Sequence, residues 1–456
     1  MLTTITTAGA AAAEAREWLR RAEGEPPITT VRVLYPDLHG VARGKDVPVS
    51  QFEHVVEHGL CFCAAVMGTD LHHTPVVGGE QGYPDLIARP DLSTMLSVPW
   101  EPGVACCLAD LEPADPAKPI ADPRGALRRA IEVVRALGLE PIVGPELEFF
   151  LLRREQTNPA TFSRHVDHLS MVYTVGPQAD PGALVRKMTE DLSRFGLPVY
   201  AVNHEFMNSQ YEINLRHSPA LAAADDAFRL KAAVKDIAAQ HGLLATFMGK
   251  PFNDQGGSGT HLHLSLGREQ RNACADPEGE HGLSAELRSF VAGVLAHAGA
   301  LMALTCPTIN AYRRILPDSL APTHANWGLD NRAACIRIPP ERGGATRLEL
   351  RVGDGAANPY LAIAAVLLAG ADGLRKGLTP PPPVEGDAYR AAPELIGEPL
   401  PRTLEQALAA LEADRVICDG LGAEIVETFL AIKRFELERN RAWVSDWELA
   451  EYAHHL

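Results

Sequence analysis

Two glutamates, Glu146 and Glu148, stand one residue apart in an otherwise apolar stretch that runs from Ile142 to Leu152. Such flanks are typical of a mostly buried β-strand, in which side chains two positions apart share a face. Two carboxylates held together between hydrophobic walls are unfavourable unless a positive charge lies between them. A lone Glu-x-Glu is usually an exposed strand edge with solvated acids. The alternative is a site for one or two divalent cations, which needs further ligands elsewhere in the chain.

Two later segments contain candidate ligands of the same character. Glu205 and Glu212 lie in the segment 203–214, where Glu212 alternates with apolar residues. His261 and His263 would share one face of a strand that follows a glycine-rich turn, and glycine there allows the backbone to approach a ligand closely.

A third segment, 347–351, presents Arg347, Glu349 and Arg351 on one strand face and leucines on the other. Each segment taken alone also has a structural explanation, because strand histidines are often hydrogen-bonded in place and glutamates often face solvent. Acids and histidines on four strands of one domain are harder to explain in that way. Five glutamates and one histidine suit Mg²⁺ or Mn²⁺, since hard cations take carboxylate oxygen and Mn²⁺ also takes imidazole.

An arginine-rich region covers 310–317 and 326–339. Arginine recognises phosphate and carboxylate through two parallel hydrogen bonds, so this region suits an anionic substrate. A network of surface ion pairs is the alternative, but the apolar Cys335, Ile336 and Ile338 around Arg337 disfavour it.

The composition bounds the function further. The chain has 456 residues, 46% hydrophobic and 22% charged, which is enough for a large core and two domains. Its net charge of -16 argues against nucleic acid or an anionic membrane as the main partner. The eight cysteines follow no CxxC or zinc-type spacing and are expected to be thiols of a reducing compartment. Without a basic signal sequence or a membrane-length apolar run, a cytoplasmic location is expected.

The order of the predicted elements indicates an α+β protein. We expect a helical extension over 1–26, a small domain over 27–118 that opens with a hairpin, and a larger domain over 119–456. A proline-rich linker is predicted at 115–123. Besides the strand of Glu146, the expected strands of the larger domain are 211–215, 245–248, 261–266, 334–338 and 346–352. Its expected helices are 124–137, 182–195, 221–240, 285–304, 359–374, 404–411 and 423–441.

The motifs, taken in order, make the chain resemble the glutamine synthetase family from about Thr29 to the C-terminus. The matching stretches are Val41–Lys45, Glu146–Glu148, Gln210–Glu212, Phe247–Pro251, Gly257–His261, Asn331–Arg332, Ile336–Pro339, Arg347–Arg351 and Asn358–Leu361. The resemblance implies a β-grasp-like N-terminal domain and a catalytic domain built on a curved antiparallel sheet backed by helices. It also implies a homo-oligomeric double ring, usually a dodecamer, whose active sites are shared between neighbouring subunits.

The resemblance also implies a role for each candidate ligand. Two or three Mg²⁺ or Mn²⁺ ions are expected in each site. One ion would be held by Glu148, Glu205 and Glu212. A second, between the phosphates of ATP, would be held by Glu146, His261 and Glu349.

The substrates are assigned in the same way. Nucleotide binding is implied for Arg337, Arg347, His263 and Ser265, and a catalytic role in phosphoryl transfer for Arg332. Arg314, Arg351 and Gly257 would bind the acid substrate. The family reaction uses ATP to phosphorylate the γ-carboxylate of glutamate, and an amine then displaces the phosphate. Two metals and several arginines suit this chemistry because they spread the charge of the transferred phosphoryl group.

The ammonia-binding half departs from the family pattern. Leu320 stands where a flexible loop normally carries a glutamate that takes a proton from ammonium, and Cys63 replaces a second acid. Asp85 matches a third, catalytic acid. Because ammonium needs an anionic cage, we expect Leu320 and Cys63 to line a substrate pocket for a larger amine. Asp318 is the candidate substitute base, with a turn-forming aspartate as the alternative.

Two further departures concern the acid substrate. Gly256 replaces a family asparagine and Ser209 replaces a glycine, which leaves open whether glutamate is the only acid used. The expected function is an ATP-dependent glutamate–amine ligase. The alternatives are a genuine glutamine synthetase, which Leu320 disfavours, and a non-catalytic relative, which the six filled metal positions disfavour.

Overall fold

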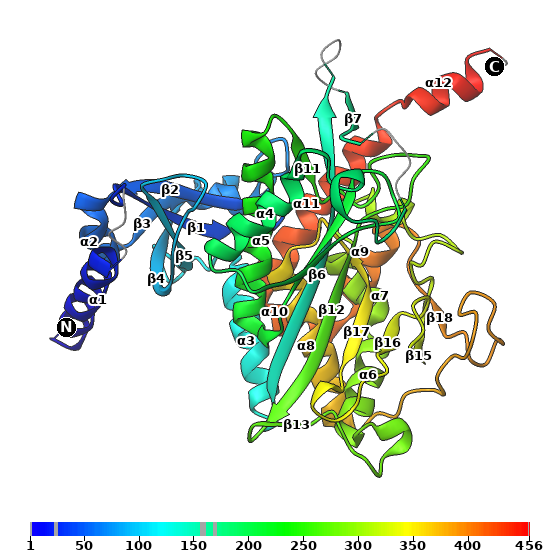
Figure 1. The fold of residues 1–456 in the computed structure, drawn as a ribbon. Helices are drawn as coiled ribbons and strands as arrows, with labels where there is room; N and C mark the ends of the chain where they lie inside the picture. The colour runs from blue at the N-terminus through cyan, green and yellow to red at the C-terminus, as the bar shows by residue number, and fades with distance from the viewer. Residues whose placement is uncertain (1, 22–25, 156–160, 167–170, 455) are drawn as a thin grey trace.

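The computed structural model describes residues 2–21, 26–155, 161–166, 171–454 and 456. It is a mixed fold of helices with a small N-terminal sheet and a large, curled C-terminal sheet (Figure 1). A two-stranded sheet of β14 (His324–Ala325) and β18 (Glu398–Pro399) completes it. The predicted α+β character is confirmed at this level.

The N-terminal sheet has five strands in the order β2-β1-β5-β4-β3. These strands are β1 (Thr30–Pro36), β2 (Ala42–Pro48), β3 (Leu60–Cys63), β4 (Asp85–Ser97) and β5 (Val104–Pro113). The antiparallel pairing of β1 with β2 confirms the predicted hairpin. β5 was not predicted, because most of its residues are buried, and such a strand lacks the alternation that reveals a half-exposed one.

The large sheet runs in the order β15-β16-β17-β12-β6-β9-β8, with four short strands attached at its sides. The main strands are β6 (Glu140–Arg154), β8 (Val199–His204), β9 (Gln210–Leu215), β12 (Gly259–Arg268), β15 (Trp327–Leu329), β16 (Ile336–Ile338) and β17 (Leu348–Asp354). The attached strands are β7 (Phe162–Arg164), β10 (Ser218–Pro219), β11 (Leu244–Thr246) and β13 (Arg271–Asn272). The predicted strands of the larger domain all fall on this sheet, and β6 lies near its centre.

Helices pack on the apolar face of the large sheet and form most of the core. They are α3 (Pro123–Arg135), α4 (Leu184–Arg194), α5 (Ala220–Gln240), α6 (Ala285–Ala296), α7 (Ala298–Thr305), α8 (Pro359–Lys376), α9 (Leu404–Ala413), α10 (Arg415–Leu421) and α11 (Ala423–Arg441). The remaining helices are α1 (Leu2–Arg21), α2 (Val49–His58) and α12 (Asp446–Tyr452). α8 is buried from Pro359 to Gly373, which is why its sequence is apolar on every side.

The single helix predicted over 285–304 is wrong, because the chain bends by 74° between α6 and α7. His297 stands at the bend and hydrogen-bonds Asp414 through Nδ1 at 2.6 Å and Asp372 through Nε2 at 3.1 Å. Within the described residues no single helix is long and apolar enough to cross a membrane, although this bent pair meets the length and composition together.

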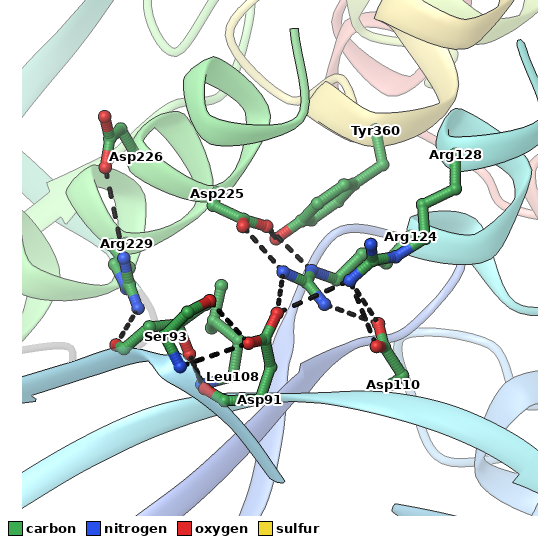
Figure 2. Close-up of polar contacts among 11 residues, drawn as sticks. Asp91, Ser93, Leu108, Asp110, Arg124, Arg128, Asp225, Asp226, Arg229 and Tyr360 are labelled. Atoms are coloured by element: carbon green, nitrogen blue, oxygen red, sulfur yellow. Dashed lines mark hydrogen bonds and ion pairs between the residues drawn. The ribbon is translucent and has the colours of Figure 1, made fainter. Parts of the chain in front are cut away.

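A buried ion network joins the N-terminal sheet to the helices of the larger domain (Figure 2). Arg124 of α3 is 1% exposed and lies 2.8 Å from both Asp91 of β4 and Asp225 of α5. It also pairs with Asp110 of β5, while the hydroxyl of Tyr360 on α8 donates to Asp225 at 2.7 Å. A buried arginine is tolerated only when its charge is paired in this way, so the network fixes the N-terminal sheet against the helices of the larger domain.

The C-terminal tail ends in α12, which extends away from the body of the molecule (Figure 1). Its large apolar side chains are exposed, with Trp443 at 74% and Trp447 at 63%. Such a surface is typical of a segment that packs against another protein chain.

Candidate active site

The register of the large sheet brings the predicted ligands into one row. β6 pairs antiparallel with β9, which sets Glu148 opposite Glu212. β6 also pairs with β12, which sets Glu146 opposite His261. Because residues directly opposite each other on antiparallel strands point to the same face, the four side chains meet above one face of the sheet.

The row continues across the next two strands. β12 pairs with β17 so that His263 lies opposite Glu349, and β17 pairs with β16 so that Glu349 lies opposite Arg337. The leucines that alternate with these residues, Leu262 and Leu350, belong to the core beneath.

Glu146 lies at the centre of the row. Its Oε2 is 3.4 Å from Nδ1 of His261, and its Oε1 is 3.0 Å from Nε2 of His263. Burial would raise the pKa of Glu146, but the hydrogen bonds from the two rings outweigh it and hold that pKa well below its ordinary value. Glu146 is therefore a carboxylate at neutral pH.

Glu349 is held by arginine on the opposite side of the row. Nη1 of Arg337 donates to Glu349 at 2.6 Å, and Arg351 pairs with the other carboxylate oxygen. Burial opposes ionisation, whereas the nearby His261 and Arg351 lower the pKa of Glu349 to about 2.

The side of the row around Glu212 carries an excess of negative charge. Burial, followed by repulsion from Glu146 and Glu148, raises the pKa of Glu212 to about 9. Burial, followed by repulsion from Glu148, raises the pKa of Glu205 to about 7. Within the described residues no lysine or arginine forms an ion pair with either carboxylate. A cation is needed for both to ionise, so this donor set fits a divalent ion.

The candidate ligand atoms form two groups, and within each group they all lie within 4.8 Å of one another. The groups are Glu146 with Glu212 and His261, and Glu146 with His263 and Glu349. Glu148 belongs to neither group. Its Oε2 accepts hydrogen bonds from Gln210 at 2.9 Å and from the Gly259 amide at 2.8 Å. The division of the ligands between individual ions stays a prediction.

The residues expected to bind the acid substrate lie beside these acids. Arg314 is buried and hydrogen-bonds the carbonyl of Gly353. A side chain at Gly257 would meet Cγ of Arg314 at 2.6 Å, so glycine is required there. A side chain at Gly256 would meet only the flexible Met207, at 3.1 Å. The asparagine of the resembled family would therefore fit at Gly256 if Met207 moved.

The residues expected to bind the nucleotide lie further along the row. Arg347 donates from Nε to Nδ1 of His263 at 3.1 Å, which links it to the ligand cluster. Arg332 is exposed, and its guanidinium hydrogen-bonds no described residue; only its carbonyl is used, by Arg351 at 2.8 Å. Ser265 lines a separate cavity of about 560 Å³ at the end of β12. A phosphate could reach Arg332 without breaking an existing ion pair.

Residues 120–452 match the family described as glutamine synthetase, catalytic domain. The chain belongs to the glutamine synthetase family. It is 37% identical to the glutamine synthetase of Thermotoga maritima over 96% of this chain and 99% of that protein. It is also 37% identical to the glutamine synthetase of Thermus thermophilus, over 96% of this chain and 98% of that one.

Solved structures agree with this family. A GmaS/ADP complex superposes with a TM-score of 0.84 at 31% identity and covers 97% of this chain and 99% of its own. GmaS without ligand gives 0.81 at 32% identity, covering 94% and 97%. Members of the glutamine synthetase family are ATP-dependent carbon–nitrogen ligases that bind glutamate and divalent metals.

Leu320, which departs from the glutamine synthetase pattern, and Asp318, the candidate substitute base, lie on one loop. Leu320 is 45% exposed on the loop after Arg314 and has a positive φ of 58°. Asp318 on the same loop makes a two-point ion pair with Arg390, at 3.0 and 2.9 Å. Both carboxylate oxygens of the candidate substitute base are therefore occupied by Arg390.

Cys63 and Asp85 are not brought to the ligand cluster within one chain. They lie opposite each other on β3 and β4 of the N-terminal sheet, and both are exposed. Figure 1 shows this sheet apart from β12 and β17. Within one chain they therefore take no part in the ligand cluster of the large sheet.

Ser209, the other departure, has a φ of 65° and is fully buried. The glycine of the glutamine synthetase pattern adopts this conformation easily. Here the Ser209 hydroxyl instead accepts a hydrogen bond from the Val166 amide at 2.7 Å.

Sequence reasoning missed Asp354, at the end of β17. It is fully buried, 3.9 Å from Nε of Arg314, and burial raises its pKa to about 6. The strand alternation that revealed Arg347, Glu349 and Arg351 does not extend to it. The signal available was a further acid at the end of the strand that carries Glu349 and Arg351.

Proposed function

We propose that this chain is an ATP-dependent ligase that joins glutamate to an amine larger than ammonia through an acyl-phosphate intermediate. The observation that carries the choice of amine is Leu320, an apolar and half-exposed side chain on the loop beside Arg314. The likeness to GmaS, a gamma-glutamylmethylamide synthetase, supports the same choice.

The phosphoryl-transfer half is assigned to the large sheet. Two or three Mg²⁺ or Mn²⁺ ions would be held there by Glu146, Glu212, His261 and Glu349, with Glu148 and Glu205 beside them. Bound there, the metals would neutralise the phosphates and the transferred phosphoryl group. Arg337 and Arg351 already fix the Glu349 carboxylate through both oxygens, which orients it before any ligand binds.

The nucleotide is assigned to the neighbouring residues. Arg332 is free to meet the transferred phosphoryl group, and Arg347 and His263 would meet the phosphates of ATP. Ser265 would contact the rest of the nucleotide in its cavity.

The acid and the amine are assigned to the other side of the cluster. Arg314, with Gly257 packed against it, would bind the carboxylate of glutamate. Leu320 would cover the hydrocarbon part of the amine, and Cys63 would line the same pocket from a second subunit, next to Asp85. Asp85 would remain the acid nearest the amine nitrogen.

A shared site requires a homo-oligomer, which we propose to be a cytoplasmic double ring. The exposed Trp443 and Trp447 of the C-terminal tail support association with further copies.

The test is the release of phosphate from ATP with glutamate and a panel of amines. The panel should include ammonium, methylamine, longer alkylamines, polyamines and aromatic amines, and mass spectrometry should identify each product. We expect a higher kcat/KM for at least one alkylated amine than for ammonium. Efficient glutamine formation from ammonium, with no gain from larger amines, would contradict the proposal.

Glutamine synthesis from ammonia is the second candidate, and the names of the 37%-identical relatives favour it. The amine panel decides between the two. An absence of phosphate release with every amine would instead favour a non-catalytic relative.

A further inference from the structure

A cavity of about 1150 Å³ lies outside the active site, between segments that are distant in sequence. One wall is formed by the loops at 38–41 and 71–74 of the N-terminal part. A second is formed by α5 with 246–248, and a third by α11 with the chain up to Trp443. None of the residues assigned to metal, nucleotide, acid or amine lines it.

The lining is strongly basic in a chain whose net charge is -16. Five lysine and arginine side chains line the cavity, against a single acid, Glu436. The five are Lys231, Lys235, Arg313, Lys433 and Arg439. A positively charged cavity raises the local concentration of anions, even in a protein whose net charge is negative.

Three of these cations have partners and two do not. Lys433 pairs with Glu436 at 2.9 Å, Arg439 pairs with Asp70, and Lys231 donates to the carbonyl of Ala357 at 2.8 Å. Among the described residues, neither Lys235 Nζ nor the Arg313 guanidinium has a hydrogen-bond or ion-pair partner. Both residues line the cavity and are exposed at their surface, although the Lys235 ammonium is surrounded by enough protein to lose much of its solvation.

Lys235 shows the cost of lacking a counter-ion. Burial lowers its pKa, and the weaker attraction of Asp236 and Asp37 does not compensate. Its Nζ lies 5.9 Å from the centre of the Phe247 ring, which also lies 5.7 Å from Nζ of Lys231. Lys231 is buried and already donates to the carbonyl of Ala357, so Lys235 is the lysine of this pair that is left for an anion.

The rest of the lining is apolar. Phe247, Met248, Ile309 and Trp443 contribute to it. A few convergent charges within an apolar cavity are typical of a small-molecule site, and the volume suits such a ligand.

We propose that this cavity binds a small organic molecule that carries at least two anionic groups, carboxylate or phosphate, and that it is a second ligand site separate from the active site. Lys235 of α5 and Arg313, from the segment 307–313 that also lines the cavity, bind the anionic groups. Phe247 and Trp443 contact the apolar part.

The cavity backs onto the residue assigned to the acid substrate. Arg313 faces the cavity, whereas the next residue, Arg314, is buried and bonded to Gly353. Asp354 lies beside Arg314, and both Arg314 and Lys231 lower its pKa, so the charges of cavity and substrate site act on one carboxylate. A ligand held by Lys235 and Arg313 adds negative charge near Lys231 and therefore changes the affinity for the acid substrate. This coupling rests on the proposed function, whereas the binding does not.

The binding test uses citrate and pyrophosphate as probes with the full-length protein. Metal is removed on a chelating resin rather than with EDTA, which is itself a polycarboxylate. Removing the metal prevents the probes from binding through an active-site ion, and the variants below distinguish the cavity from the arginines of the active site. Calorimetry measures the dissociation constant of each probe. A change in tryptophan fluorescence on binding, present in the unmodified protein and lost in Trp443→Phe, places the probe in the cavity.

Two charge reversals, Lys235→Glu and Arg313→Glu, are compared with Lys118→Glu, an exposed lysine elsewhere on the surface. We expect at least one probe to bind, and each of the two reversals to weaken it roughly tenfold or more. Lys118→Glu should leave the affinity unchanged. The probe that binds more tightly identifies carboxylate or phosphate as the preferred group. Failure of both probes to bind, or equal affinity in all variants, would overturn the site.

The coupling is tested in the ligase assay at constant free Mg²⁺. The bound probe should change the KM for glutamate in the unmodified protein and not in Lys235→Glu. Binding by calorimetry with an unchanged KM would overturn the coupling alone. A protein that binds a probe in the cavity but has no ligase activity would count against the proposed function and leave the site standing.

Discussion

Glu146 and His261 face each other across β6 and β12, with 3.4 Å between Oε2 of the glutamate and Nδ1 of the histidine. Glu146 also lies 3.0 Å from Nε2 of His263, so it belongs to both groups of candidate ligand atoms. The two groups therefore share one carboxylate, and the first prediction follows from this sharing.

Glu146→Gln should weaken metal binding in both groups at once. We expect Mn²⁺ affinity and kcat/KM each to fall roughly 100-fold or more, because loss of outer-sphere partners alone costs 10- to 100-fold. Calorimetry and steady-state kinetics measure the two effects. The matched control is Glu140→Gln, on the same strand but paired with Arg135 at 2.8 Å. Near-normal Mn²⁺ binding in Glu146→Gln would contradict the assignment.

Glu212→Gln should have opposite effects with and without metal. Burial, followed by repulsion from Glu146 and Glu148, raises the pKa of Glu212 to about 9. At pH 7 the metal-free folded protein must therefore protonate a side chain that is ionised in the unfolded chain, and glutamine removes that cost. We expect the metal-free melting temperature to rise by roughly 2–4 °C, as ~1 kcal/mol does in a large domain. Mg²⁺ should raise the melting temperature of the unmodified protein, and this rise should be lost in Glu212→Gln. A variant that melts lower without metal, or keeps the full response to Mg²⁺, would show that Glu212 is not part of the site.

Leu320→Glu should shift the amine preference toward ammonium. A carboxylate at this position supplies the negative charge that a small cation needs and removes the apolar contact of a larger amine. The expected change is roughly tenfold or more in the ratio of kcat/KM for ammonium to that for the best alkylamine. Leu316→Glu, at a 52% exposed leucine on the same loop, is the control. An equal shift in both variants would point to general loop charge rather than to the amine pocket.

Arg124→Met should destabilise the junction between the N-terminal sheet and the helices of the larger domain. The substitution leaves Asp225 and Asp91 without their buried partner, and breaking a buried pair in this way costs about 3–5 kcal/mol. Arg128→Met removes an arginine of the same helix whose side chain is 43% exposed, and should cost about 1 kcal/mol or less. Denaturant unfolding compares the two. Equal losses would mean that the buried network does not fix the N-terminal sheet against these helices.

His297 should make stability depend on pH. Its hydrogen bond to Asp414, opposed by burial and aided by Asp372, raises the pKa of His297 above its ordinary value of 6.5. The protonated ring is bound more tightly in the folded state, so its stabilisation is complete below pH 6.5 and is lost as pH rises through the folded pKa. The melting temperature should fall over that window in the unmodified protein, and less so in His297→Gln. His58→Gln, at a 61% exposed ring, should keep the original slope. A slope that is unchanged in His297→Gln would assign the pH dependence to other groups.

Side-chain alternation was enough to predict much of the site. Glu146 with Glu148, His261 with His263, and Glu349 with its flanking arginines each share a strand face because successive side chains point to opposite faces. The strands that carry them were predicted for the same reason. β5 and the bend at His297 were not, since a buried strand shows no alternation and the partners of His297 lie 75 and 117 residues away.

The sequence by itself determined the types of ligand and the face on which each pair lies. Only the tertiary structure decided which carboxylate meets which histidine, because strand register depends on the packing of the whole sheet. It also decided that Glu148 is engaged by Gln210 and Gly259, and that Lys235 and Arg313 share one cavity. Local spacing reaches a few residues along one strand or helix, whereas these contacts join segments brought together only when the core closes.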